Sequence, residues 1–270
     1  MSTRSSLVGL LVGGVAAGIW IGRAVGPAEA QQRADFTWKG RLAKGKTIEI
    51  RGIMGDVRAE LAAGPDVEVT ATKTARRSEP EDVRIEVVEH EDGATICAVY
   101  PARRGKPGNE CRPGGGGNNS SENNDVSVRF SVKVPAGVRF VGTTVSGDVI
   151  ARSLKSDVEL RTVNGGIDAS TTGYAEATTV NGSIDLVMGS VGWPRQLEYS
   201  TVNGGITIQV PDGIKADVEA ETVNGDIESD FPLTVSGRFG PRRLSGTIAG
   251  GGPLLSLRTV NGSIELRRAP

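Results

Sequence analysis

Apolar and polar residues alternate along most of the chain after residue 36. In the clearest stretch every second position is apolar, at Val126, Val128, Phe130, Val132 and Val134. Residues 67–72 and 83–87 show the same alternation. A period of two with one apolar face is typical of a β-strand that buries one side. No helical period of useful length is present after residue 36, so the pattern predicts an all-β protein.

The tetrapeptide Thr-Val-Asn-Gly occurs five times in the second half of the chain, beginning at Thr162, Thr179, Thr201, Thr222 and Thr259. Degenerate copies of the wider twelve-residue frame begin at Ile48, Phe140 and Phe239. From Phe140 onward, successive frames begin 16 to 22 residues apart. Repeats at this period predict a stacked architecture in which each unit contacts its neighbours.

The apolar positions change parity inside each repeat. Val158 and Leu160 occupy even positions, whereas Ile167 and Ala169 occupy odd ones. Because a shift of one residue turns every side chain to the other face of a strand, the chain must bend between them. Asn-Gly readily adopts the positive φ angles of a turn or bulge. The predicted turn residues are therefore Asn164, Gly165, Asn181, Gly182, Asn203, Gly204, Asn224, Gly225, Asn261 and Gly262.

These features predict a single-stranded, right-handed parallel β-helix with irregular rungs of roughly 16–22 residues. An antiparallel hairpin at each Asn-Gly is the competing geometry, but the near-identical flanks of the copies favour stacked rungs. Stacking would align the valines, the isoleucines and the asparagines in columns, with each asparagine amide bonding to the next. The last repeat ends at Leu266, and as an open terminal rung it would invite head-to-tail stacking of copies.

The chain divides into three parts by pattern. Residues 1–30 form a leader, and residues 31–134 form a strand-rich part with a polar, glycine-rich loop at 101–125. Residues 135–268 carry the solenoid repeats and are expected to continue the preceding part as one domain.

Short motifs connect the repeats to a known family. Val134–Gly137 and Val210–Gly213 both read V-P-x-G, and each leads into a strand and then a turn, at Ser146–Val149 and Asn224–Ile227. Over roughly residues 36 to 268 the chain resembles the bacterial envelope domains of unknown function called putative-adhesin or β-strand-repeat proteins. The resemblance implies a right-handed β-helix on an exported or membrane-anchored protein, and it implies no catalytic residues.

The leader has the order of a secretory signal peptide. Arg4 precedes an apolar run from Leu7 to Gly22, and a small-x-small site predicts cleavage after Ala30. The alternative is an uncleaved membrane anchor, which would associate through a G-x-x-x-G ladder at Gly14, Gly18 and Gly22. The apolar run is 16 residues long, short of the ~20 that a spanning helix needs. Both alternatives place the repeats outside the cytoplasm, in the periplasm or at the cell surface.

Charge and cysteine content narrow the classes of function. The 31 basic and 32 acidic residues balance, so no global field attracts nucleic acid. Cys97 and Cys111 are the two cysteines of the chain. In an exported protein they permit one disulfide, and the alternative is a pair of free thiols.

Candidate chemistry is sparse. His90, the single histidine, lies in the acidic sequence Glu89–Asp92 and is expected at a solvated hairpin tip. Outward carboxylates recur in the repeats at Glu159, Glu176, Glu198 and Glu219, and at Asp168, Asp185, Glu228 and Glu265. Stacked ~4.8 Å apart, such carboxylates repel unless cations or arginines intervene. Nucleophile elbows, phosphate loops and zinc-ligand spacings are absent from the sequence. We therefore predict no catalytic residue, cofactor or metal site.

The sequence thus favours a non-catalytic, adhesin-like envelope scaffold that interacts with a surface, a polymer or other copies of itself. An envelope polysaccharide is the partner class that suits this reading, and nucleic acid is not. Two alternatives remain open, a glycan-binding or glycan-active β-helix and an extracytoplasmic sensor domain.

Overall fold

The computed structural model describes residues 35–102, 105, 109–115, 121, 123–236 and 242–269. The expected signal peptide and its alternative, the membrane anchor, lie outside these residues. Within the described ranges, no helix combines the length and hydropathy needed to cross a bilayer. The described part after residue 33 is one compact unit built from two β-sheets.

The described strands form a ten-stranded sheet and an eleven-stranded sheet, which we call sheet A and sheet B. Sheet A has the spatial order β1 (Phe36–Gly40), β4 (Val67–Thr74), β7 (Ser127–Val134), β3 (Val57–Leu61), β9 (Val149–Leu154), β11 (Ile167–Thr171), β13 (Ile184–Met188), β15 (Ile206–Val210), β21 (Ile264–Arg268) and β17 (Ile227–Ser229). Sheet B has the order β18 (Thr234–Ser236), β19 (Arg242–Ile248), β16 (Ala216–Asn224), β20 (Leu254–Asn261), β14 (Leu197–Ser200), β12 (Ala175–Thr178), β10 (Val158–Arg161), β8 (Arg139–Thr143), β2 (Thr47–Arg51), β6 (Gly93–Val99) and β5 (Arg84–His90).

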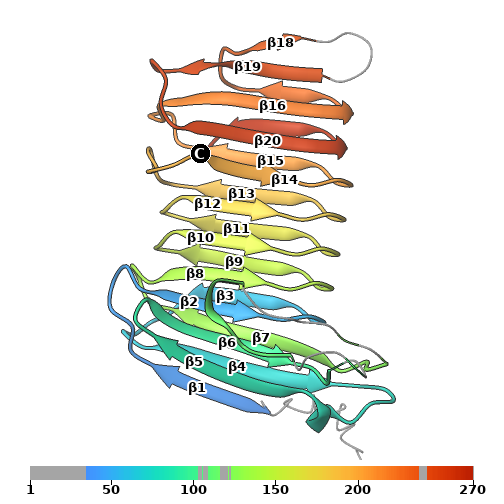
Figure 1. The fold of residues 1–270 in the computed structure, drawn as a ribbon. Coiled ribbons are helices and arrows are strands. Elements are labelled where there is room, and N and C mark those ends of the chain that lie inside the picture. The colour runs from blue at the N-terminus through green and yellow to red at the C-terminus, as the bar shows by residue number, and fades with distance from the viewer. Residues whose placement is uncertain are drawn as a thin grey trace, which may run out of the picture. The chain divides into compact units, whose positions relative to one another are not determined.

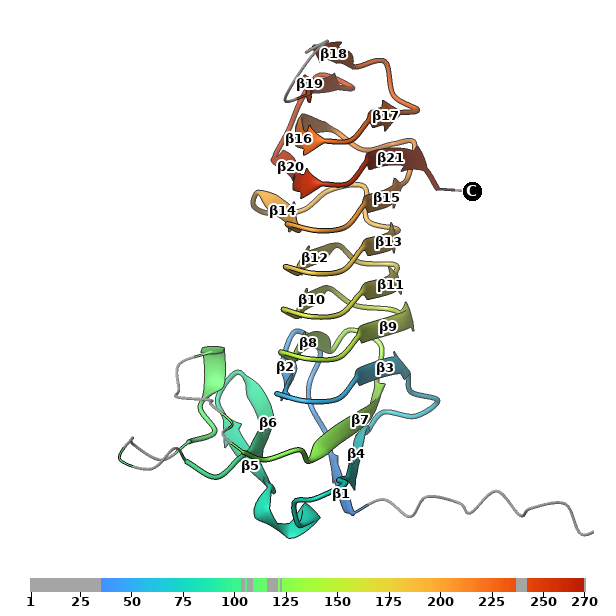
Figure 2. The same ribbon diagram turned by 90° about the vertical axis from the view of Figure 1, so that its right-hand side faces the viewer.

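Each repeat forms one rung, with a strand in sheet B, a corner at Thr-Val-Asn-Gly and a strand in sheet A. Neighbouring rungs pair in parallel and in register, as Val158 with Ala175 and Ile167 with Ile184 show. In Figure 1 the strands β8, β10 and β12 run to the right in front, and after each of them the chain returns behind and enters the rung above. Figure 2 shows the two sheets edge-on. The fold is the right-handed β-solenoid that the repeats predicted, and the strands flanking each Asn-Gly lie in different sheets rather than in a hairpin.

The core lies between the two sheets and follows from the alternation along each strand. The predicted isoleucine column is confirmed, since its members are at most 7% exposed: Ile167, Ile184, Ile206, Ile264 and Ile227. Leu160 faces them from sheet B and is fully buried. Burying one such side chain stabilises the fold by about 1.5–3 kcal/mol. The upstream degenerate copy also forms a rung, in which β2 and β3 pair in parallel with β8 and β9.

The predicted asparagine ladder is confirmed at the corners of the rungs. The Nδ2 of Asn181 donates to Asn164 Oδ1 at 2.7 Å, and that of Asn203 donates to Asn181 Oδ1 at 2.8 Å. The ladder continues at 2.8 Å from Asn261 to Asn203 and from Asn224 to Asn261. Each ladder bond therefore ties one rung to the next through side chains, in addition to the backbone.

The corner glycines are required by close stacking. A Cβ on Gly182 would lie 1.9 Å from the carbonyl oxygen of Gly165. A Cβ on Gly204 or on Gly225 would likewise lie 2.0 Å from a glycine carbonyl oxygen of the neighbouring rung. The positive φ angles predicted for the Asn-Gly turns are wrong for most copies. Among the described corner residues of the five copies, only Gly262 has a positive φ, and no asparagine does. The constraint is the neighbouring rung and not the local dihedral angle.

The last repeat is not the last rung. Strand β20 pairs in parallel with β14 on one edge and with β16 on the other, and β21 lies between β15 and β17. The expectation of an open terminal rung at Leu266 is therefore wrong. The described part of the degenerate copy that begins at Phe239 is also not a rung, because β19 pairs antiparallel with β16. Because β19 occupies the outer edge of β16, the repeat that follows β19 in the chain can pair only with the inner edge of β16, through β20.

We expect the ladder to contribute unequally at its middle and its end. Asn181→Ala removes two ladder bonds, whereas Asn224→Ala removes one. At about 1 kcal/mol for each bond, the free energy of unfolding should fall by about 2 and about 1 kcal/mol respectively. Chemical denaturation of both variants checks this, and equal losses would contradict a continuous ladder.

We expect Gly182→Ala to be severely destabilising, because the new methyl group overlaps a backbone carbonyl that cannot move without opening the stack. The free energy of unfolding should fall by roughly 3 kcal/mol or more. Gly192→Ala is the matched control, since a Cβ there has no neighbour within 4 Å. A thermal melt in which both variants unfold like the parent would refute the steric account.

Candidate functional site

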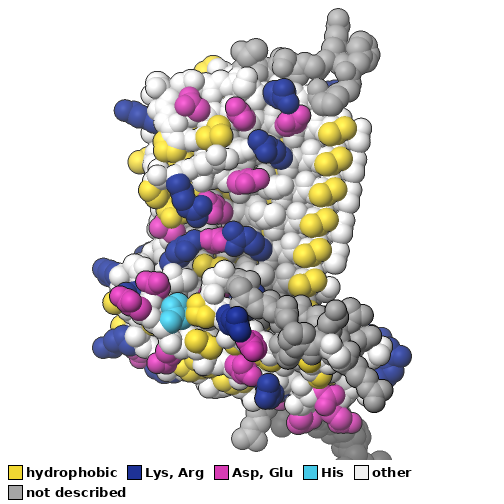
Figure 3. All heavy atoms as spheres, viewed as in Figure 1, with side chains coloured by type: hydrophobic (Ala, Val, Ile, Leu, Met, Phe, Trp, Pro, Cys, Tyr) yellow, Lys and Arg dark blue, Asp and Glu magenta, His cyan; other side chains and the backbone are white. Residues whose placement is uncertain are grey.

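The outer face of sheet B is hollowed along several rungs. A cleft of about 780 Å³ lies over β2, β8 and β10, and the β5–β6 hairpin and the Pro113–Gly114 segment wall it. A second hollow of about 350 Å³ shares Glu159 and Arg161 with the first and continues over β12 and β14. We call the two together the sheet B groove. In Figure 3, acidic and basic side chains alternate up this face, above the single histidine.

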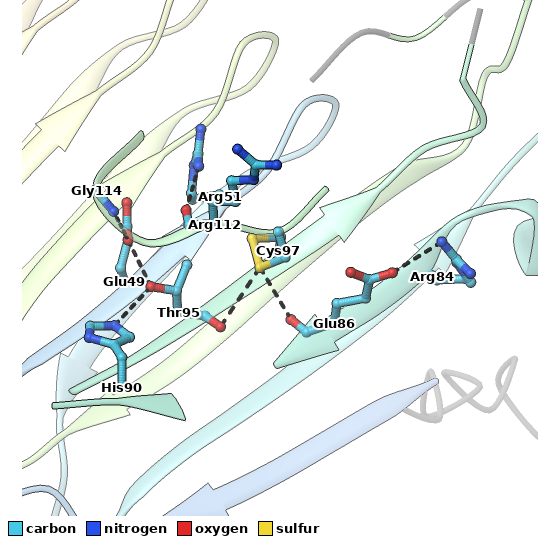
Figure 4. Close-up of a disulfide and its surroundings, with 10 residues drawn as sticks. Glu49, Arg51, Arg84, Glu86, His90, Thr95, Cys97, Arg112 and Gly114 are labelled. Atoms are coloured by element: carbon cyan, nitrogen blue, oxygen red, sulfur yellow. Dashed lines mark hydrogen bonds and ion pairs between the residues drawn. A yellow bond between two sulfur atoms is a disulfide. The ribbon is translucent and has the colours of Figure 1, made fainter. Parts of the chain in front are cut away.

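A disulfide fastens the wall of the groove. Cys97 of β6 and Cys111 are bonded, with their Cα atoms 5.5 Å apart (Figure 4). Beyond the disulfide, Arg51 Nη1 donates to the carbonyl of Arg112 at 2.8 Å, and the Gly114 amide donates to Glu49 Oε2 at 3.1 Å. Part of the loop expected at 101–125 lies outside the described residues. Its section at 109–115 is held against sheet B by these three links.

Behind the wall, three polar side chains form a hydrogen-bonded chain. Glu49 is 8% exposed, and its Oε2 accepts a hydrogen bond from Thr95 Oγ1 at 2.8 Å. His90 Nε2 lies 3.2 Å from the same hydroxyl. The hydroxyl of Thr95 has one hydrogen, and it donates that hydrogen to the Glu49 carboxylate. His90 must therefore be the donor in its own bond to Thr95, through an N–H at Nε2. His90 closes the β5–β6 hairpin as expected, but its half-buried side chain is held at the groove instead of being freely solvated.

Arginines separate the carboxylates at the centre of the groove. Glu159 lies between Arg139 and Arg161 and forms an ion pair with each. Arg195 bonds Glu176 at 2.8 Å and lies 3.9 Å from Glu159. Burial raises the pKa of Glu176, and the neighbouring Glu159 adds to the rise, while Arg195 opposes it. The groove floor is therefore an alternating charge network.

The predicted carboxylate columns form only in part. On sheet B, Glu159 and Glu176 are register neighbours, but Ser256 separates Glu198 from Glu219. On sheet A, Asp168 lies beside Asp185, while Thr207 stands between Asp185 and Glu265.

At each end of the carboxylate column on sheet A, two acidic residues are still register neighbours. They are Asp168 with Asp185 at one end and Glu265 with Glu228 at the other. Burial raises the pKa of Asp185, with Asp168 and Glu265 adding to the rise. Arg267 joins Glu228 at 2.5 Å and Glu265 at 3.2 Å. Among the described residues, no three His, Cys, Asp or Glu side chains are placed to hold a metal ion.

Sequence reasoning found part of the groove. It singled out His90, Glu159, Glu176 and Glu198, which line the groove, but not Arg139 or Arg195. Arg195 lies in the connection between rungs, outside the repeat frame, so no periodic signal marks it. The predicted Asn-Gly residues lie at the corners of the rungs, where they build the stack and do not line the groove.

The chain is similar to one known protein family and to several solved structures. The sequence profile described as Toastrack DUF4097 matches residues 117–267. No curated protein sequence matches the chain significantly. Similar solved structures include a putative cell adhesion protein from Clostridium sporogenes, at 11% identity and a TM-score of 0.41, covering 87% of this chain and 99% of that one. A putative adhesin from Bacteroides fragilis has 13% identity and a TM-score of 0.36, covering 87% and 96%.

We expect the disulfide to set both the stability of the fold and the rigidity of the wall. Alkylation of the unreduced, denatured protein should find no free thiol. Cys97→Ser/Cys111→Ser should lower the free energy of unfolding by about 3 kcal/mol, as the chain-entropy model gives for a loop of this size. Hydrogen exchange at the Gly114 amide should accelerate more in this double variant than in Arg51→Ala, which loses only the hydrogen bond to the Arg112 carbonyl. Two alkylated thiols in the unreduced protein would contradict this.

Proposed function

The chain belongs to the Toastrack DUF4097 family, and from that premise we propose that it is an exported, non-catalytic envelope protein that binds a hydroxyl-rich polymer in the sheet B groove. The family match and the adhesin-named structures support a surface protein in general terms. The polymer and the site are our proposal.

The observation that carries the proposal is the continuity of the groove across rungs. Its two hollows share Glu159 and Arg161 and run over five neighbouring strands, β2, β8, β10, β12 and β14. At ~4.8 Å between strands, this path is about 19 Å long. An open path of that length suits an extended segment of a linear chain better than a single small metabolite.

The charge pattern selects the chemistry of that chain. Among the described lining residues, the arginines are Arg51, Arg139, Arg161 and Arg195, and the acids are Glu49, Asp92, Glu159, Glu176 and Glu198. Such a balance gives no attraction for a polyanion. Arginine offers only donors and an ionised carboxylate only acceptors, whereas a sugar hydroxyl both donates and accepts. A neutral polysaccharide can therefore use both kinds of side chain.

Two further features support an exported, non-catalytic role. A structural disulfide persists in oxidising compartments outside the cytoplasm. The groove carboxylates are also engaged, since Glu159 pairs with two arginines and Glu49 accepts from Thr95 and Gly114. Groups held in this way orient a ligand.

A glycan array followed by calorimetry tests the proposal. Arg195→Ala removes a half-exposed groove arginine, and Arg152→Ala removes an arginine of similar exposure that pairs with Asp168 on sheet A. We expect Arg195→Ala to weaken binding of the best glycan at least tenfold, as loss of a hydrogen bond to a charged group predicts, and Arg152→Ala to leave it unchanged. Equal losses, no binding at all, or release of shortened glycan would overturn the proposal.

A further inference from the structure

The valine of Thr-Val-Asn-Gly is the one residue of the motif that the stack does not explain. The threonine is buried, and its hydroxyl donates to a glycine carbonyl of the neighbouring rung, as Thr201 does to Gly182 at 2.9 Å. The asparagine makes the ladder, and the glycine permits the close approach. The valine points outward and is 37–42% exposed in every copy.

These valines form a straight column, which we call the valine ridge. In stacking order its members are Val145, Val163, Val180, Val202, Val260 and Val223. Figure 3 shows the ridge as a regular row of apolar side chains along the edge of the stack. Large hydrophobic side chains are otherwise rare on the described surface, where Val191 is the one other exposed example.

The residues around the ridge have diverged while the valine has not. The position before the threonine is arginine, threonine, serine, glutamate or arginine in the five copies, and the position after the glycine is glycine, serine, glycine, aspartate or serine. An outward position half exposed to water tolerates many residue types. Retention of one apolar residue through this variation points to a contact made by the ridge itself.

We propose that the valine ridge is a self-association surface on which the ridge of a second copy of this chain packs. The surface lies at the corner of the rungs, outside the sheet B groove, so the proposal does not rest on polymer binding. Its members repeat at the ~4.8 Å spacing of the strands. A second ridge has the same spacing, so it can keep every valine in contact over all the rungs.

The chemistry beside the ridge also suits a second copy. On the side of the ridge that follows the corner glycine, the central rungs carry the uncharged residues Gly166, Ser183, Gly205 and Ser263, so no charge must be desolvated on that side. Each inner asparagine of the ladder (Asn181, Asn203 and Asn261) uses one N–H and one lone pair within the ladder. A second N–H and a second lone pair remain on each amide, and an opposing asparagine ladder supplies the complementary groups.

The area of the ridge sets the strength of the association. Six half-exposed valines offer on the order of 300 Å² of apolar surface, well under the ~800 Å² that each partner buries in a standard interface. The dimer should therefore be weak in solution, with a dissociation constant on the order of 0.1–1 mM. Copies held together on one surface would associate more strongly, because tethering raises their effective concentration.

Sedimentation velocity of the full chain over a concentration series tests the proposal. The parent should show a monomer–dimer equilibrium, and Val163→Asp/Val202→Asp, which places charges two rungs apart, should remain monomeric throughout. Val191→Asp is the matched control, since Val191 is 57% exposed but lies off the ridge, and it should dimerise like the parent. All variants share the same N-terminus, so any association through it cancels in the comparison.

A milder variant keeps the test valid if the aspartates impair folding. Replacing Val163, Val180, Val202 and Val260 by threonine preserves side-chain shape and should weaken dimerisation at least tenfold. Disulfide trapping reports the alignment: Val180→Cys should cross-link to itself in a parallel pair, and to Val202→Cys in a mixed sample of an antiparallel pair.

Two results would overturn the proposal. The first is a parent that stays monomeric at millimolar concentration, and the second is a dimer that the aspartate variant retains. If the parent is monomeric and the aspartate variant also loses glycan binding, the ridge belongs to the polymer site. Loss of glycan binding in Arg195→Ala alone bears on the groove and leaves the ridge untouched.

Discussion

The structure depends on how closely one rung approaches the next. At the corners a glycine Cα lies directly against the glycine carbonyl of the neighbouring rung, so that any Cβ would overlap it. This contact keeps the backbones in register, and the buried threonine hydroxyl and the asparagine amide then reach their partners on the adjacent rung. The isoleucine column and both sheets follow from the same register.

Exact stacking also determines what the surface presents. When rungs repeat in register, an outward residue that is the same in every copy forms a continuous column of one side-chain type. An outward position that differs between copies forms a column of mixed side chains. The valines form a column of the first kind, and the arginines and glutamates of sheet B form mixed columns. The molecule therefore offers two surfaces of different character, an apolar ridge at the corner and a polar groove on the face.

The groove needs more than the stack. Its wall comes from the β5–β6 hairpin and the segment at Pro113–Gly114, which the disulfide and the bond from Gly114 to Glu49 hold over β2. These parts lie outside the repeats, and a regular solenoid face without them would be flat. The β5–β6 hairpin and the Pro113–Gly114 segment thus turn one end of a regular solenoid face into a cleft.

The sequence by itself determined the rung. Alternation, the parity change at Asn-Gly and the repeated tetrapeptide predicted the parallel solenoid, the isoleucine column and the asparagine ladder, because each depends only on residues inside one repeat and its identical neighbour. The tertiary structure alone decided the order of the rungs, since near-identical repeats can stack in any sequence, and β19 on the outer edge of β16 leaves the inner edge for β20. It likewise decided the groove, whose Arg139, Arg195 and Pro113 come from segments far apart in the chain with no shared pattern.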